Sequence, residues 1–405
     1  MNTATKNYAT ITAGYWAFTL TDGAIRMLVV LYFHILGYSP LEVAMLFLFY
    51  EFFGIVTNLV GGWLGAKLGL NVTMHIGMAL QIIALLMLTV SDSMLSVAYV
   101  MLAQALSGIA KDLNKMSAKS GVKSLVKTAK DDPKLFKWVA VLTGSKNALK
   151  GVGFFLGAFL LDLMGFRNAL LVLAAGLSLV LITTYVLLPR ELGKAKNKPK
   201  FNQILSQSRQ INWLSAARFF LFGARDIWFV VALPVFLYEK LGWSFSQVGS
   251  FIALWIIAYG IVQALTPILL RQHQPTAKSA SLLALVLALV PAGIALSLMQ
   301  SWPPSITIII GLMIFGVIFA INSAVHSYLI LAYADHDKVA MNVGFYYMAN
   351  AGGRLTGTVL SGLVYQQAGI VACLWVSSVF VLVAMGLSLS LSKINIHQKL
   401  PIIKR

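Results

Sequence analysis

The chain has 405 residues, of which 59% are hydrophobic and only 11% charged, and its mean hydropathy is +0.82. Soluble domains carry about 25% charged residues, so the composition excludes a soluble globular protein and indicates a polytopic membrane protein. The single cysteine, Cys373, excludes a disulfide framework and a thiolate metal site. We expect no cofactor, no metal site and no catalytic residues, because no nucleophile–base or metal-ligand constellation stands out.

Apolar segments follow one another along the whole chain. A helix of about 20 apolar residues crosses a hydrocarbon core of about 30 Å. By that rule we predict an all-α integral membrane protein with twelve transmembrane helices, at residues 9–36, 40–65, 72–91, 94–116, 138–163, 166–188, 212–238, 245–270, 279–299, 304–331, 340–366 and 369–391.

Basic residues concentrate in alternate connections between these helices. They fill 119–137, 190–209, 271–278 and the tail 393–405, whereas the opposite set holds only Arg167 and Lys240. The positive-inside rule therefore predicts that both termini are cytoplasmic. Most of the net charge of +18 reflects topology, so we expect a lipid bilayer and no nucleic acid as the partner.

The chain also repeats itself. LGYSPLEVA at 36–44 recurs as LGWSFSQVG at 241–249, and KNALKGVGFFLG at 146–157 aligns with NAGGRLTGTVLSG at 350–362, which places Lys150 opposite Arg354. Arg26 lies close to the equivalent of Arg225. We therefore predict two pseudo-symmetric six-helix bundles, 1–188 and 212–405, joined by a cytoplasmic linker at 189–211. This resembles the major facilitator architecture, in which the substrate binds near the midplane between two parallel repeats.

Charged residues lie inside the predicted spans, and most of them are cations. A charge in the hydrocarbon costs about 2.5–3.5 kcal/mol, so each needs a partner or water. The cations are Arg26, Lys111, Lys146, Lys150, Arg218, Arg225 and Arg354, and the acids at similar depth are Asp22, Glu51, Asp112 and Asp226. The surplus of positive charge indicates a site for a small anionic substrate.

We assign substrate binding to five of the cations: Arg225, Arg354, Lys150, Lys146 and Arg26. Three acids would position them or carry protons: Asp22, Asp226 and Glu51. Asp22 and Arg26 are spaced i,i+4 and can pair, whereas the adjacent Arg225 and Asp226 are expected to point in different directions. Lys111 and Asp112 are expected near the cytoplasmic rim.

Uncharged polar residues supply candidate hydrogen bonds to a ligand: Asn322, His326, Tyr346 and Asn350. Hydrogen bonding between helices is the alternative role for each. The alternative for the charges is an ion-pair network that holds the helices together.

Several runs resemble a specific family, the ArsJ organoarsenical efflux permeases of the major facilitator superfamily. They are GYWAFTLTDGAIRMLVV (14–30), ALSGIAKDLNKMSAKS (105–120), LTGSKNALKGVGFFLG (142–157), SAARFFLFGARDIWFVVALP (215–234) and GFYYMANAGGRLTG (344–357). GWLGAKLGLN at 62–71 resembles the superfamily's cytoplasmic signature, with Ala66 in place of its usual acidic residue.

The resemblance implies export of 1-arseno-3-phosphoglycerate across a bacterial inner membrane. This ester forms when glyceraldehyde-3-phosphate dehydrogenase uses arsenate in place of phosphate, so that enzyme is the expected functional partner of a monomeric permease. Related organophosphate antiporters use one arginine on helix one and one on helix seven, which Arg26 and Arg225 match. The alternatives are uptake or exchange of an ordinary organophosphate or organic anion, and a non-transporting anion receptor.

Overall fold

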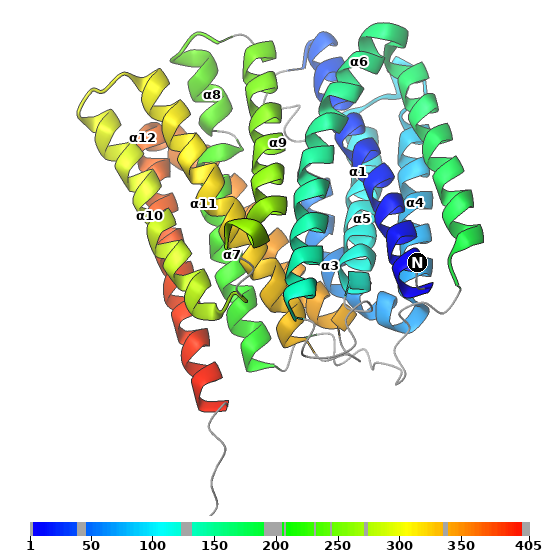
Figure 1. The fold of residues 1–405 in the computed structure, drawn as a ribbon. Helices are drawn as coiled ribbons and strands as arrows, with labels where there is room; N and C mark the ends of the chain where they lie inside the picture. The colour runs from blue at the N-terminus through cyan, green and yellow to red at the C-terminus, as the bar shows by residue number, and fades with distance from the viewer. Residues whose placement is uncertain are drawn as a thin grey trace, which may run out of the picture.

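The computed structural model describes residues 3–38, 46–122, 132–189, 205, 208–230, 232–243, 245–270, 274–334 and 339–398. Within these ranges all regular structure is helical (Figure 1). Only helices satisfy every backbone polar group within one apolar segment, which is why these stretches form them. The elements are α1 Thr3–Ile35, α3 Leu48–Leu68, α4 Leu70–Met87, η1 Asp92–Met94, α5 Val97–Val122, α6 Asp132–Leu187, α7 Arg209–Phe229, α8 Ala232–Glu239, α9 Phe245–Leu269, α10 Ala277–Met299, α11 Pro304–Tyr333 and α12 Val339–Gln398.

The twelve predicted spans correspond to these helices. α6 and α12 each contain two spans, because the backbone breaks at Gly165 (φ 75°) and Gly369 (φ 71°), where the left-handed conformation favours glycine. The predicted span 212–238 is divided between α7 and α8. In the described part of the chain, seven helices are long and apolar enough to cross a membrane by length and hydropathy, and α5 and α7 are not among them. Their charged residues account for that difference.

Turns at equivalent places support the predicted duplication. Gly37 (φ 90°) and Gly242 (φ 69°) both have positive φ, as do Gly165 and Gly369. The members of each pair lie about 205 residues apart, which is the offset read from the sequence repeats. The proposed linker, 189–211, lies largely outside the described residues, as does the lysine-rich stretch 123–131.

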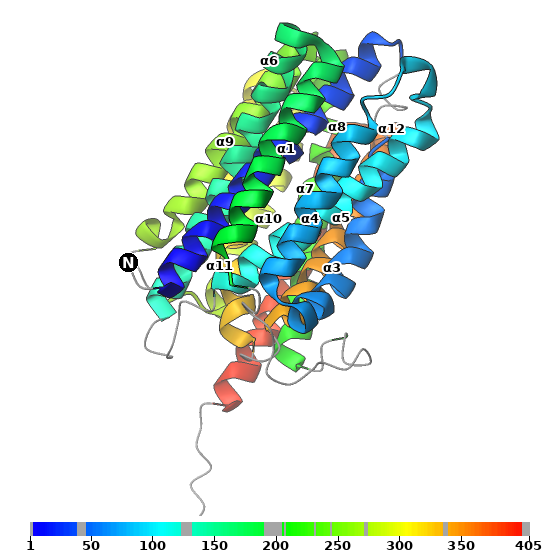
Figure 2. The same cartoon turned by 90° about the vertical axis from the view of Figure 1, so that its right-hand side faces the viewer.

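The two halves stand side by side, with α1 and α3–α6 on the right of Figure 1 and α7–α12 on the left; Figure 2 shows the bundle from the side. The start of α1 and the end of α12 lie at the same end of the bundle (Figure 1). One apolar core belongs to the first half and another to the second.

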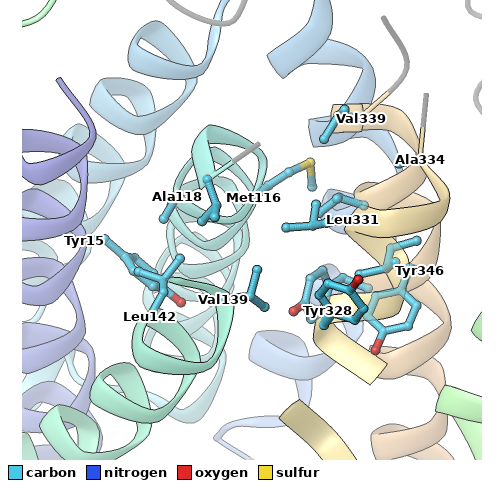
Figure 3. Packing of buried hydrophobic residues seen from close by; sticks show 14 of the residues in the cluster. Tyr15, Met116, Ala118, Val139, Leu142, Tyr328, Leu331, Ala334, Val339 and Tyr346 are labelled. Carbon is cyan, nitrogen blue, oxygen red and sulfur yellow. The ribbon is translucent and has the colours of Figure 1, made fainter. Parts of the chain in front are cut away.

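A third apolar cluster joins the halves at the end where α1 starts. It contains Tyr15 of α1, Met116 of α5, Val139 of α6, Leu331 of α11 and Tyr346 of α12, among others (Figure 3). We call it the terminal-side cluster. Its packing closes the seam between the halves at that end of the molecule.

Small residues allow helix backbones to touch, as the sequence repeats on α6 and α12 predict. Gly153 of α6 lies against Gly23 of α1, and Gly357 of α12 lies against Gly223 of α7. Between the halves, Gly144 of α6 faces the carbonyl oxygen of Gly260 on α9. Close backbone approach of this kind is how helices associate in lipid.

Adding a methyl group at Gly153 should therefore destabilise the protein. A Cβ there would lie 2.6 Å from the Leu20 carbonyl oxygen, and a backbone atom cannot move aside cheaply. We expect Gly153→Ala to cost about 1–3 kcal/mol, as overpacking does, and to lower the melting temperature in detergent. Gly176→Ala, on the same helix with nothing within 4 Å, is the control and should leave it unchanged or slightly raised. Equal behaviour of the two variants would contradict this packing.

Candidate functional site

Each half contains a buried ion pair, and the two pairs occupy equivalent positions in the repeat. In the first half the Lys150 ammonium donates to Asp22 Oδ2 at 2.9 Å, which joins α6 to α1. In the second half Arg354 Nε donates to Asp226 Oδ2 at 3.1 Å, which joins α12 to α7. Both pairs span 128 residues of sequence, so the duplication extends to the buried charges.

Glu51 of α3 connects the first half to the second. Its Oε1 accepts from Arg354 Nη2 at 2.7 Å and from Arg26 Nη2 at 3.3 Å, and its Oε2 lies 3.8 Å from the Lys111 ammonium. A single carboxylate thus faces three cations from three other helices. Together with the two matched pairs, it forms what we call the central network.

Tyr50, next to Glu51, organises the first-half side of this network. Its hydroxyl donates to Asp22 Oδ1 at 2.5 Å. Its buried ring lies 3.8 Å from the Lys111 ammonium and 4.8 Å from the Arg26 guanidinium carbon. Cation–π contacts of this kind stabilise desolvated cations. The sequence analysis missed Tyr50; its place beside a membrane-depth glutamate was the available signal.

Two expectations about pairing are wrong. Asp22 pairs with Lys150 and Tyr50, and Arg26 instead reaches Glu51. Arg225 Nε donates to the adjacent Asp226 Oδ1 at 2.6 Å, because its long side chain folds back along α7.

The expected position of Lys111 is also wrong. Lys111 belongs to the central network instead of the cytoplasmic rim, since its side chain extends to Glu51. Asp112 is buried and pairs with Lys115, one turn further along α5, and its Oδ2 lies 3.8 Å from the Lys111 ammonium.

Lys146 lies beside the central network and has no carboxylate partner among the described residues. Its ammonium donates to Asn147 Oδ1 at 3.2 Å, and its charge interacts with that of Lys150. Asn147 in turn donates to Gln263 Oε1 of α9 at 2.6 Å, which is a second polar link between the halves. No motif or repeat in the sequence pointed to Gln263.

The candidate hydrogen-bonding residues gather elsewhere, around Arg218. Arg218 Nε donates to Asn350 Oδ1 at 2.8 Å, and Nη1 donates to Ser323 Oγ at 3.2 Å. Its guanidinium carbon lies 5.2 Å from the Tyr346 ring centroid, and its charge interacts with His326. Asn322 is buried beside Ser323 on α11. These residues therefore do not join the central network.

The central network combines deeply buried acids with partly exposed cations. The Asp22 and Asp226 side chains are 3% and 0% exposed, whereas Arg26 and Arg354 are 25% and 26% exposed. Three carboxylates there face five cations, Arg26, Lys111, Lys150, Arg225 and Arg354, and a sixth cation, Lys146, lies beside them. Such a focused positive field attracts anions. Among the described residues, no three His, Cys, Asp or Glu side chains group to hold a metal ion.

The family model of the Major Facilitator Superfamily matches residues 11–330 and 214–402. The chain belongs to the Major Facilitator Superfamily. Members of this superfamily are membrane transporters and not enzymes, and its fold explains the two halves and the charged seam between them. No curated protein matches the sequence.

Solved structures share the whole fold of this transporter. The human organic anion transporter MFSD10 has a TM-score of 0.73 at 16% identity, covering 95% of this chain and 99% of its own. A bacterial homologue of the iron transporter ferroportin in an outward-facing state has a TM-score of 0.74 at 16% identity, with 96% and 99% covered. The E. coli fucose:proton symporter FucP has a TM-score of 0.72 at 11% identity, with 96% and 100% covered.

Breaking a buried ion pair of this transporter should destabilise the fold more than breaking a surface ion pair does. Removing one member of a buried pair leaves an uncompensated charge and costs about 3–5 kcal/mol. We therefore expect Asp22→Asn to lower the melting temperature strongly, and the additional change Lys150→Met to restore much of it.

The control is Asp92→Asn, whose partner Arg167 lies 3.6 Å away in a pair that is more than half exposed. This change should lower the free energy of unfolding by at most about 1 kcal/mol. If Asp22→Asn were as mild as this control, the Asp22–Lys150 pair would not stabilise the fold.

Proposed function

We propose that this transporter exports a small organic polyanion by alternating access, and that the substrate is 1-arseno-3-phosphoglycerate. The observation that carries the proposal is the surplus of partly exposed cations in the central network. These cations come from both halves, as an alternating-access site requires. A bound polyanion would supply the negative charge that three carboxylates do not.

An oxyanion suits this site better than other anions. Guanidinium groups match the paired oxygens of phosphate, arsenate or carboxylate, and ammonium groups add point charges. We assign Arg354, Arg225 and Arg26 to the first role and Lys150 and Lys146 to the second. Trivalent arsenic would need several thiolates, and the chain has one cysteine, whereas a pentavalent arsenate ester binds as phosphate does.

The carboxylates have a positioning role in this proposal. Asp22 and Asp226 hold Lys150 and Arg354 between helices, and they remain buried when a substrate binds. Glu51 is more accessible and shares Arg26 and Arg354, so the substrate competes with it for the same two arginines. Proton transfer through these acids is a further part of the proposal.

We place the protein in a bacterial inner membrane as a monomer, with both termini in the cytoplasm. The common end of α1 and α12 would then be the cytoplasmic side (Figure 1). The substrate would be made there by glyceraldehyde-3-phosphate dehydrogenase, which makes that enzyme a functional partner. The resemblance of the sequence runs to the organoarsenical permeases is the support for this assignment.

Inverted membrane vesicles test the proposal. They are supplied outside with arsenate, glyceraldehyde 3-phosphate, NAD and the dehydrogenase, and lumenal arsenic is measured. We expect arsenic to accumulate with the wild-type protein, and accumulation to be abolished in Arg225→Ala, which loses a substrate cation but still inserts. Arg167→Gln, an exposed arginine far from the network, should transport normally.

The same vesicles separate the alternatives. Dehydrogenase-independent movement of 3-phosphoglycerate alone would indicate uptake or exchange of an ordinary organophosphate. Binding without any flux would indicate a receptor. Full arsenate resistance of cells that carry Arg225→Ala would contradict the assignment of the site.

A further inference from the structure

A second cationic site lies away from the central network, within the terminal-side cluster. Lys119 is near the end of α5, and only 3% of it is exposed. Its ammonium has no hydrogen-bond partner among the described residues. Apolar neighbours on the same helix, Met116 and Val122, belong to the terminal-side cluster. A lysine is rarely buried in this way unless something pairs with it.

The charged groups that act on Lys119 are also positive. Its charge interacts with Arg218 on α7, in the other half, and with Lys115 on its own helix. Arg218 is 3% exposed, and its hydrogen bonds go to the neutral groups of Asn350 and Ser323. Lys115 pairs with Asp112, which leaves Lys119 and Arg218 without a carboxylate in the described part of the chain.

Aromatic rings and polar groups surround these cations. The Lys115 ammonium lies 4.4 Å from the Tyr347 ring centroid, and the Tyr346 and Tyr347 rings are 5.0 Å apart. His326 is fully buried on α11, and neither of its ring nitrogens has a partner among the described residues. Unpaired polar atoms in a buried place are costly, and a bound polar ligand would satisfy them.

We propose that Lys119 and Arg218 form a second anion-binding site, on the terminal side of the central network, for the phosphate- or carboxylate-type group of the transported anion. This inference rests on the proposed function. The ligand would lie between the two cations, with Asn350 and His326 as further hydrogen-bonding groups. Neutralising two buried cations with one oxyanion removes the cost of leaving each unpaired.

The position of the site links anion binding to the closing of the seam. Lys119 belongs to the first half and Arg218 to the second, so an anion between them draws the halves together. Without an anion, the two like charges repel across the seam and favour its opening. One face of α5 carries lysines at four-residue spacing: Lys111, Lys115 and Lys119. This face leads from the central network to the second site.

The test uses purified full-length protein and two probes, inorganic phosphate and 3-phosphoglycerate. Their affinities are measured from the rise in melting temperature on titration, first in wild type and then in Arg354→Gln, which impairs the central network. We expect binding to persist in Arg354→Gln and to weaken about tenfold or more when Lys119→Gln is added, as loss of a charge-assisted hydrogen bond predicts.

Two control variants separate the loss of the Lys119 charge from a general effect of substitution. Lys119→Arg, which retains the charge, should bind within about twofold of wild type, and Lys6→Gln, an exposed lysine on α1, should bind as wild type. Lys119-dependent binding without any export would overturn the proposed function and retain this site. Unchanged binding in Lys119→Gln, absence of binding in Arg354→Gln, or an equal effect of Lys6→Gln would overturn the site.

Discussion

The ion pairs of Glu51 are the interaction on which the other charges between the two halves depend. A cation at membrane depth needs a negative partner, and this carboxylate serves Arg26, Lys111 and Arg354 at once. It is also the residue through which an ion pair crosses from the first half to the second. Arg354 also pairs with Asp226 and Lys111 also lies near Asp112, whereas Glu51 is the one carboxylate paired with Arg26 in the described part of the chain. In our proposal this incomplete neutralisation leaves the seam able to bind a further anion.

Each half has an equivalent ion pair between two of its helices, near the shared Glu51. Asp22–Lys150 and Asp226–Arg354 fix equivalent helices together, and small residues at Gly153 and Gly357 let those helices approach closely. These contacts tie α1 to α6 and α7 to α12. The halves meet through a shared carboxylate, an amide pair, the terminal-side cluster and the glycine contact of α6 with α9.

Much of this organisation could be predicted from the sequence. Helix number followed from apolar length, and the equivalence of Lys150 and Arg354 followed from the repeat. The pairing of charges could not be predicted, because it depends on which helices become neighbours. Asp22 has Arg26 one turn away but faces Lys150 across a glycine seam. Asn350 was expected near the substrate cations and lies against Arg218, and Lys119 was counted only among the basic loop residues although it is buried.

In the proposed mechanism the transported anion replaces Glu51 at Arg354 and Arg26. Its most direct test is the affinity of purified Glu51→Gln for 3-phosphoglycerate, with Asp162→Asn, an exposed acid on α6, as the control. Removing an internal competitor raises the competent fraction of a site, so we predict binding about tenfold tighter than in wild type and in the control. Binding that is weaker than wild type in Glu51→Gln would contradict the claim.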